Sequence, residues 1–146
     1  MSGIPPRLAT IVEDFAGAPK DLRLDILFEF AKAFPPLPED YVGRTDLERV
    51  EECQTPLFVA VELGTDDRVR LVFDTPPEAP TTRGFASILH AGLDGETAAA
   101  VLGVPDDVTR RLELDDVISP LRMRGFASLL HRVQRRVREL VEARGR

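Results

Sequence analysis

The sequence predicts a mixed fold in which helices accompany a small antiparallel β-hairpin. Apolar residues recur at helical spacing near both ends of the chain, which indicates amphipathic helices. In the middle, two β-rich runs at 57–63 and 68–74 flank the turn sequence Gly-Thr-Asp-Asp, which is typical of a hairpin. The length of 146 residues fits a single domain spanning 1–146.

Two helices are expected before the hairpin. The first follows Pro5-Pro6, and the second ends before Pro35, because proline lacks a backbone amide and clashes with the preceding turn. Their apolar stripes comprise Leu8, Ile11, Val12 and Phe15 in the first helix and Leu22, Ile26, Leu27, Phe30 and Phe34 in the second. Together they are interpreted as a helical hairpin. A short third strand is expected near Val50.

Further helices are expected after the hairpin. One covers about 82–91, and a second, capped by Asp94, runs to Leu102. Residues 103–117 are left open apart from a helical turn beginning at 105–107. Ser119-Pro120 supplies an N-cap and a first-turn proline for a long final helix. Its apolar stripe comprises Phe126, Leu129, Leu130, Val133, Val137 and Leu140.

One octapeptide occurs twice in the chain. Residues 83–90 and 124–131 are identical in all but one position. Because a solenoid needs three or more repeats, the chain is not expected to be one. Instead, two helices are expected to pack with similar faces, with Gly84 and Gly125 allowing a close approach.

Composition narrows the function. The net charge of −6 argues against nucleic acid as the main partner, and no apolar run approaches the roughly 20 residues needed to span a membrane. The N-terminus lacks the features of a secretion signal, so a cytoplasmic location is expected. A single cysteine excludes an internal disulfide and a metal site built from several thiolates.

Charge is unevenly distributed along the chain. Residues 119–146 carry eight arginines and two glutamates, whereas the other 118 residues carry 11 basic and 23 acidic side chains. This basic helix either binds an acidic partner or is paired with acidic groups of the chain itself, and internal pairing is favoured.

Cys53 is the candidate reactive residue. A lone cysteine is more often a small buried apolar residue than a nucleophile, but Cys53 lies in a polar, loop-like context. Its neighbours Glu51 and Glu52 oppose the thiolate form. Arg122, in the first turn of the final helix, is therefore expected to supply positive charge together with the helix N-terminus. The side chains of Phe58, Phe85 and Phe126 are expected to shelter the sulfur.

Three motifs resemble those of the SufE family, over about residues 8–140. They are the cysteine segment at 50–58, Asp74 followed later by Arg83-Gly84, and Ile-Ser-Pro-Leu-Arg-Met-Arg-Gly at 118–125. The cysteine segment departs from the family pattern. Glu52 stands where the family often has glycine, so this loop cannot rely on glycine's backbone freedom, and Pro56 stiffens the loop. Thr55, Leu57 and Phe58 are conservative replacements of Ser, Val and Trp.

The resemblance implies a sulfur carrier for iron–sulfur cluster assembly. Cys53 would accept persulfide sulfur from a SufS-like cysteine desulfurase, which holds pyridoxal phosphate, and pass it to a SufBCD-like scaffold. Arg122 would be the site arginine, with Asp74, Gln54 and Arg83 in supporting positions. The chain itself would bind no cofactor and no metal. The implied fold is α/β (α+β), a small antiparallel sheet packed with helices, similar to the scaffold IscU.

Two alternative functions, from other functional classes, remain open. The first is a non-catalytic interaction module that docks acidic partners through Arg132, Arg135, Arg136 and Arg138, with Cys53 inert. The second is a redox-sensing thiol that forms a mixed disulfide.

Overall fold

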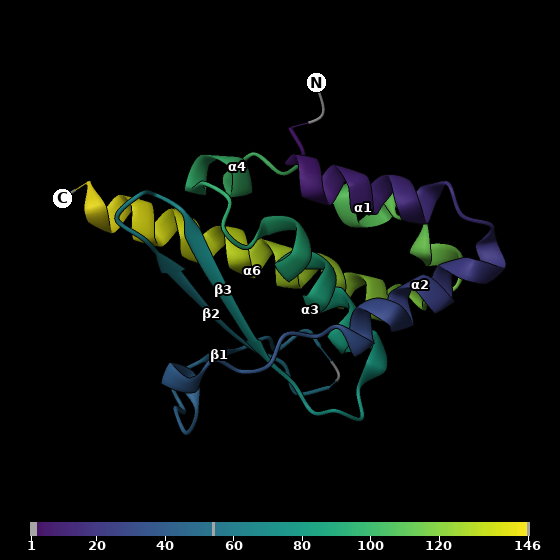
Figure 1. The fold of residues 1–146 in the computed structure, drawn as a ribbon, viewed down its shortest axis with the longest axis horizontal. Coiled ribbons are helices and arrows are strands. Elements are labelled where there is room, and N and C mark those ends of the chain that lie inside the picture. The colour runs from purple at the N-terminus through teal and green to yellow at the C-terminus, as the bar shows by residue number, and fades with distance from the viewer. Residues whose placement is uncertain (1–2, 54, 146) are drawn as a thin grey trace.

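A computed structural model describes residues 3–53 and 55–145. Within these residues the chain forms a three-stranded antiparallel sheet of order β1-β2-β3, packed with helices (Figure 1). The strands are β1 (Glu48–Arg49), β2 (Phe58–Leu63) and β3 (Val69–Asp74). The helices are α1 (Pro6–Ala16), α2 (Lys20–Lys32), α3 (Pro80–Leu93), α4 (Ala98–Leu102), α5 (Val108–Arg111) and α6 (Pro120–Arg144), with 3₁₀ turns at Glu39–Tyr41 and Leu114–Asp116. The predicted mixed fold is confirmed.

The sheet is built on the predicted hairpin. Strand β2 pairs with β3 from Phe58 opposite Asp74 to Leu63 opposite Val69. The expected third strand is β1, where Glu48 pairs with Val59. The backbone amide of Val50 donates to the carbonyl of Leu57 at 2.8 Å, which extends this pairing by one step. The chain between β1 and β2 is thereby closed into a short loop.

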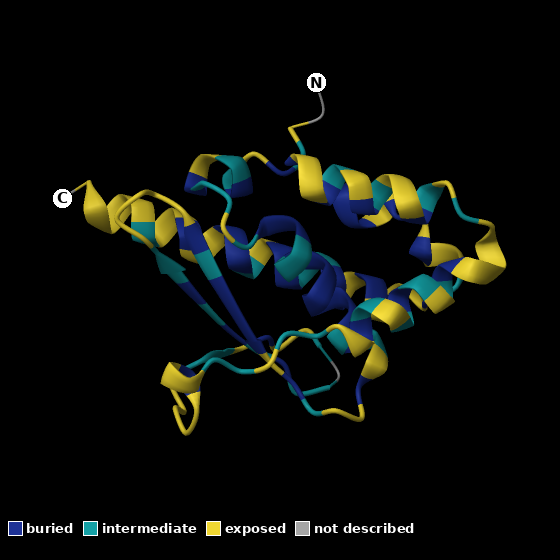
Figure 2. Cartoon of the chain, viewed as in Figure 1, coloured by how far each residue is buried: buried dark blue, intermediate teal, exposed yellow. Residues whose placement is uncertain are grey.

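Helix α6 is the long final helix that the Ser119-Pro120 pair predicted. The Ser119 hydroxyl oxygen accepts a hydrogen bond from the backbone amide of Arg122 at 3.3 Å, so the N-cap is confirmed. The helix packs along β2 and α4, with its apolar stripe in the core and its arginines at the surface (Figures 1 and 2). Among the described residues, no helix combines the length and apolarity needed to cross a membrane.

Helices α1 and α2 are confirmed as elements, but both pack mainly against α3 rather than against each other. The rings of Phe15 and Phe30 provide a contact between them, with centroids 5.9 Å apart. Leu22, expected in the core, is exposed, whereas Arg23 is buried. The Arg23 guanidinium satisfies its buried donors by bonding the carbonyl of Phe15 and the carboxylate of Asp116, which is why a charged residue is tolerated there.

Helix α4 begins later than the sequence predicted. Thr97 is its N-cap, with a side-chain oxygen that accepts from the amide of Ala100 at 3.1 Å. The expectation that Asp94 caps this helix is wrong, because its carboxylate accepts from the backbone amide of Leu71 at 2.8 Å. Asp94 thus ties the end of α3 to the sheet. The helical turn expected from 105–107 is present as α5.

The repeated octapeptides lie on α3 and α6 and do pack together. The rings of Phe85 and Phe126, at corresponding positions, stack with centroids 4.3 Å apart and planes 6° from parallel. The two glycines do not face each other, however. A Cβ atom at Gly84 would meet Leu27 of α2, and one at Gly125 would meet Cys53. Each glycine therefore admits a different neighbour.

Candidate functional site

Cys53 lies in the loop between β1 and β2. Its backbone amide donates to the carbonyl of Val50 at 3.2 Å, which forms a tight turn over residues 50–53, called here the Cys53 segment. The turn carries the cysteine side chain back toward the helices, where it is half-buried. The thiol is therefore neither fully in the core nor fully exposed.

The thiol borders a small cavity of about 20 Å³ at the first turns of α6. The cavity is lined by Cys53, Thr82, Phe85, Leu121, Arg122 and Gly125. The structure thus brings Cys53 and Arg122 to one cavity, as the sequence predicted. The Sγ atom lies 3.9 Å from the carbonyl oxygen of Gly125, to which the S–H group donates a weak hydrogen bond.

The aromatic shelter is only partly as expected. Phe85 lines the cavity, and Phe126 stacks on the Phe85 ring without lining the cavity itself. Phe58 instead borders a separate pocket of about 230 Å³ with Asp74 and Leu47. Two of the residues that line the Cys53 cavity, Phe85 and Gly125, therefore come from the repeated octapeptides.

The pKa of the Cys53 thiol is raised in this conformation. Burial is the main cause and the charge of Glu52 adds to it, whereas Arg132 acts in the opposite direction. In this conformation the cation that acts on the pKa of the thiol is Arg132, and the expectation that Arg122 supplies positive charge to Cys53 stays a prediction. The α6 N-terminus does not supply that charge here, since its Arg122 amide is occupied by Ser119 and the thiol faces a carbonyl.

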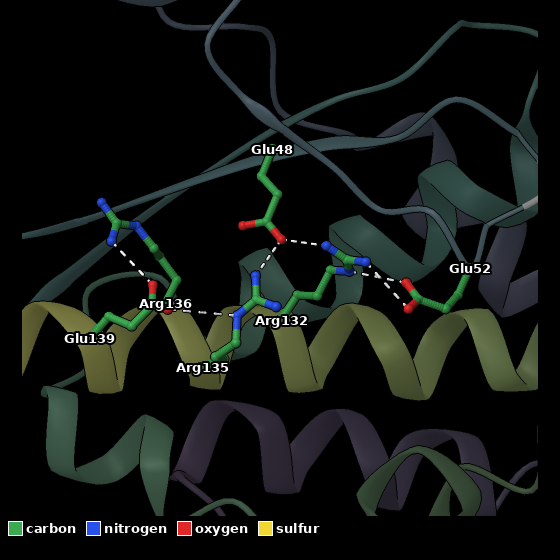
Figure 3. A network of polar contacts seen from close by, with 6 residues as sticks. All are labelled: Glu48, Glu52, Arg132, Arg135, Arg136 and Glu139. Atoms are coloured by element: carbon green, nitrogen blue, oxygen red, sulfur yellow. Dashed lines mark hydrogen bonds and ion pairs between the residues drawn. The ribbon is translucent and has the colours of Figure 1, made fainter.

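A charge network holds Glu52, the residue before Cys53, and Glu48 against α6 (Figure 3). The Arg132 guanidinium donates to both carboxylate oxygens of Glu52, from Nε at 3.0 Å and from Nη2 at 3.3 Å. It also bonds Glu48, which in turn accepts from Arg135. We call Glu48, Glu52, Arg132 and Arg135 the α6 charge network. Internal pairing, the favoured interpretation of the basic helix, is confirmed for these arginines.

The network shifts the ionisation of its members. Hydrogen bonds from Arg132 hold the pKa of Glu52 below its ordinary value. Burial acts to raise the pKa of Glu48, but hydrogen bonds from Arg135 and Arg132 outweigh it, and the net shift is downward. Both carboxylates are therefore ionised at neutral pH, and their two negative charges balance the two guanidinium groups.

The other residues singled out from the sequence lie around the site at different distances. Asp74 is exposed at the end of β3 and does not line the Cys53 cavity. Arg83 donates to the carbonyl of Thr75 at 3.3 Å and packs over the Phe34 ring at 4.2 Å. The Thr75 hydroxyl in turn donates to the carbonyl of Pro56 at 2.7 Å. Arg83 is thereby linked, through Thr75, to the part of the cysteine loop that leads into β2. Gln54 lies outside the described residues.

Sequence reasoning missed Arg132 as a site residue and the role of Gly125. Arg132 was grouped with the surface arginines, although it reaches back 80 positions to Glu52. The sequence did carry a signal for this pairing. Acidic residues cluster at 48, 51 and 52, and the arginines at 132 and 135, three positions apart, share one face of the final helix. No group of three or more His, Cys, Asp or Glu side chains suited to a metal ion occurs in the described part of the chain.

Residues 9–137 match the SufE family, described as an Fe-S metabolism associated domain. The chain belongs to the SufE family. It is 49% identical over 138 residues to an uncharacterised SufE-like protein of Mycobacterium tuberculosis, covering 94% of this chain and 96% of that protein. It is also 27% identical over 139 residues to SufE-like protein 1, chloroplastic/mitochondrial, of Arabidopsis thaliana, covering 94% of this chain and 36% of the plant protein.

The SufE fold is confirmed by a solved structure. The solution structure of a hypothetical protein from Thermus thermophilus matches with a TM-score of 0.83 and 43% identity, covering 95% of this chain and 98% of that one. SufE membership supports a role in iron–sulfur metabolism and sulfur transfer. The reactive group available for such a role is the half-buried thiol of Cys53, beside the first turns of α6.

Proposed function

We propose that this SufE-family chain is a sulfur carrier that takes persulfide sulfur from a SufS-like cysteine desulfurase onto Cys53. The observation that carries the proposal is the position of the chain's only thiol, half-buried at a cavity shared with Arg122. A carrier thiol must be reachable by a second protein, and the sulfur it carries must be sheltered from oxidation and reduction. The cavity beside Phe85 supplies the shelter.

The transfer step needs one nucleophile and no redox cofactor. Cys53, as the thiolate, attacks the terminal sulfur of the donor cysteine persulfide. A new sulfur–sulfur bond forms at Cys53 as the bond between the donor cysteine and its terminal sulfur breaks. The donor cysteine leaves as a thiolate, which takes up the proton that Cys53 released. Electrons balance, because one sulfur–sulfur bond replaces another.

Arg122 fits this step as a charge partner for the persulfide. The terminal sulfur of a persulfide carries negative charge, and Arg122 lines the same cavity as Cys53 without making an ion pair among the described residues. Its guanidinium is therefore free to approach the sulfur. Arg83 stays a supporting residue, because it contacts the loop return through Thr75 and not the thiol.

Partners follow from the same chemistry. Pyridoxal phosphate would reside in the desulfurase, and this chain would contribute only Cys53 and its surroundings. The acceptor of the sulfur would be a SufBCD-like scaffold, which would receive it by the same exchange in reverse. We expect both exchanges to occur in the cytoplasm.

The two alternatives are less well supported. A docking module built on the basic helix would need free arginines, but Arg132, Arg135 and Arg136 pair with Glu52, Glu48 and Glu139. Only Arg138 of the four is unpaired among the described residues. The redox-sensing alternative relies on the same thiol, but membership in the SufE family supports sulfur transfer instead.

The test is an intact-mass measurement after incubation with a SufS-type desulfurase and cysteine. We expect the protein to gain the mass of one sulfur atom, a gain that a reducing agent reverses. Cys53→Ser is the matched control and should gain nothing. No gain in the wild type, or an equal gain in Cys53→Ser, would overturn the proposal. A response to peroxide without any gain from the desulfurase would favour the redox-sensing alternative.

A further inference from the structure

The residue next to Cys53 anchors it to α6. Glu52 is bound through both carboxylate oxygens by Arg132, and the Arg132 side chain is only 17% exposed. Planar two-point pairing of this kind fixes orientation as well as distance. Since Cys53 follows Glu52 directly, the pairing also fixes where the thiol points.

The conformation fixed in this way is a closed one. The Sγ atom faces the Gly125 carbonyl, and the adjoining cavity of about 20 Å³ has no room for a side chain of another protein. An attacking thiolate must line up with the bond that it breaks. Cys53 therefore has to leave this position before it can meet a persulfide held by a second protein.

The contacts that hold the cysteine loop at its two ends differ in how easily they break. The Val50–Leu57 backbone bond belongs to the sheet, and the Thr75–Pro56 hydrogen bond is formed by a buried threonine. The Glu52 side chain, by contrast, is 47% exposed. When Glu52 leaves, Arg132 keeps Glu48 as a partner, so no buried guanidinium is left unpaired. The Glu52 contact is thus the one that releases most readily.

We infer that the Glu52–Arg132 ion pair is a positioning device that holds the Cys53 segment closed on α6 and opens to let the thiol reach a partner. Glu52 and Arg132 act through the position of Cys53 and do not touch the sulfur that is transferred. This role in transfer rests on the proposed function, whereas the holding itself does not. A partner surface that offers Glu52 another cation would favour the open form.

Two effects of these residues on the thiol can be separated by experiment. If Glu52 and Arg132 acted only through their charges, Glu52→Gln would favour the thiolate and Arg132→Ala would disfavour it. If the pair holds the segment closed, both substitutions expose the thiol. Because burial is the largest cause of the raised pKa, exposure then outweighs the loss of the Arg132 charge.

The experiment is alkylation of the full-length protein by iodoacetamide, a neutral reagent, followed by mass spectrometry at fixed pH. We expect both Glu52→Gln and Arg132→Ala to react a few-fold faster than the wild type. Arg136→Ala is the matched control, since Arg136 lies on the same helix and pairs with Glu139, and it should react at the wild-type rate. A slower or unchanged reaction of Arg132→Ala would overturn the inference.

A salt titration keeps the inference testable if Arg132→Ala folds poorly. Salt screens an exposed ion pair, so alkylation of the wild type should accelerate with salt, whereas alkylation of Glu52→Gln should not. Equal salt dependence in the two proteins would contradict the holding role. The proposed function fails separately, if no sulfur reaches Cys53 from a desulfurase while the alkylation rates behave as expected.

Discussion

The carbonyl oxygen of Gly125 lies 3.9 Å from the Sγ atom of Cys53, and a Cβ atom added to Gly125 would lie 3.4 Å from the same sulfur. The thiol therefore rests on a bare stretch of helix backbone. Any larger residue at this position would share the space of about 20 Å³ beside the sulfur. The absence of a side chain at Gly125 matters for what Cys53 can carry.

Gly125→Ala is expected to separate stability from sulfur loading. Alanine is favoured over glycine inside a helix by about 1 kcal/mol, and 3.4 Å to the sulfur is a tolerable contact. The free energy of unfolding should therefore stay the same or rise slightly. Persulfide formation on Cys53 should slow, because the methyl group fills the cavity that would shelter the added sulfur. Denaturant unfolding and timed intact-mass measurements check the two halves.

Gly84→Ala is the matched control, since Gly84 occupies the same position in the other copy of the octapeptide. There the added Cβ would lie 2.5 Å from the Leu27 side chain and 2.9 Å from its backbone oxygen. Helix α2 would have to move, so unfolding should become easier by about 1–3 kcal/mol. Wild-type loading in Gly125→Ala would show that the carried sulfur does not use the cavity.

Arg122→Ala should slow sulfur loading more than it affects stability. The Arg122 side chain is exposed and its backbone amide, which Ser119 caps, is retained. Exposed substitutions of this kind change the free energy of unfolding by about 0.5 kcal/mol or less. The measurements are the rate of persulfide formation with a desulfurase and the melting temperature. Arg124→Ala, on the same helix, is the control. A large drop in melting temperature with normal loading would assign Arg122 a structural role.

The sequence predicted the elements of this fold better than it predicted their contacts. Pro5-Pro6 and Ser119-Pro120 predicted where α1 and α6 begin, because proline and capping residues act within one turn of a helix. The hairpin followed equally from local alternation of residues. Asp94 was misassigned because a carboxylate near a helix start can also bond a distant amide, here that of Leu71.

In the candidate site, too, the residues could be predicted from the sequence but their contacts could not. Cys53 and Arg122 were identified from local motifs, and the structure brings them to one cavity. The Glu52–Arg132 pair joins residues 80 positions apart, and no local pattern indicates which of several arginines reaches Glu52. The direction of the Cys53 pKa shift depends on that choice and on burial, so it could not be predicted from the sequence.

Glu48→Gln should lower stability at neutral pH and lose this effect in acid. The pKa of Glu48 is lower in the folded chain than in the unfolded one, so its ionised form stabilises the fold above the unfolded value of about 4.3. As the pH falls through the folded pKa, that contribution disappears. We expect a difference of about 1 kcal/mol at pH 7, the upper range for an exposed pair, shrinking to nothing in acid.

Denaturant unfolding of wild type and Glu48→Gln across this pH range is the measurement. Glu51→Gln is the control, because Glu51 is exposed and makes no ion pair among the described residues. A difference between wild type and Glu48→Gln that persists or grows in acid would mean that Glu48 acts through shape and not through charge.

Thr75→Val should loosen the return of the cysteine loop without altering any charge. The Thr75 side chain is buried and its hydroxyl donates to the Pro56 carbonyl at 2.7 Å. Valine has the same shape but leaves that carbonyl unpaired, at a cost of about 1–3 kcal/mol. Iodoacetamide should then reach Cys53 faster. In contrast to the effect expected for Glu52→Gln, the wild-type dependence on salt should remain, because the Glu52–Arg132 pair is intact.

Thr81→Val, at the nearby start of α3, controls for the loss of a hydroxyl group that makes no hydrogen bond among the described residues. If Thr75→Val is destabilised but is alkylated at the wild-type rate, the Pro56 side of the loop does not govern access to the thiol. The Cys53 segment would then be held from the Glu52 side alone. Faster alkylation would instead show that the hydrogen bond from the Thr75 hydroxyl to the Pro56 carbonyl helps to hold the thiol in place.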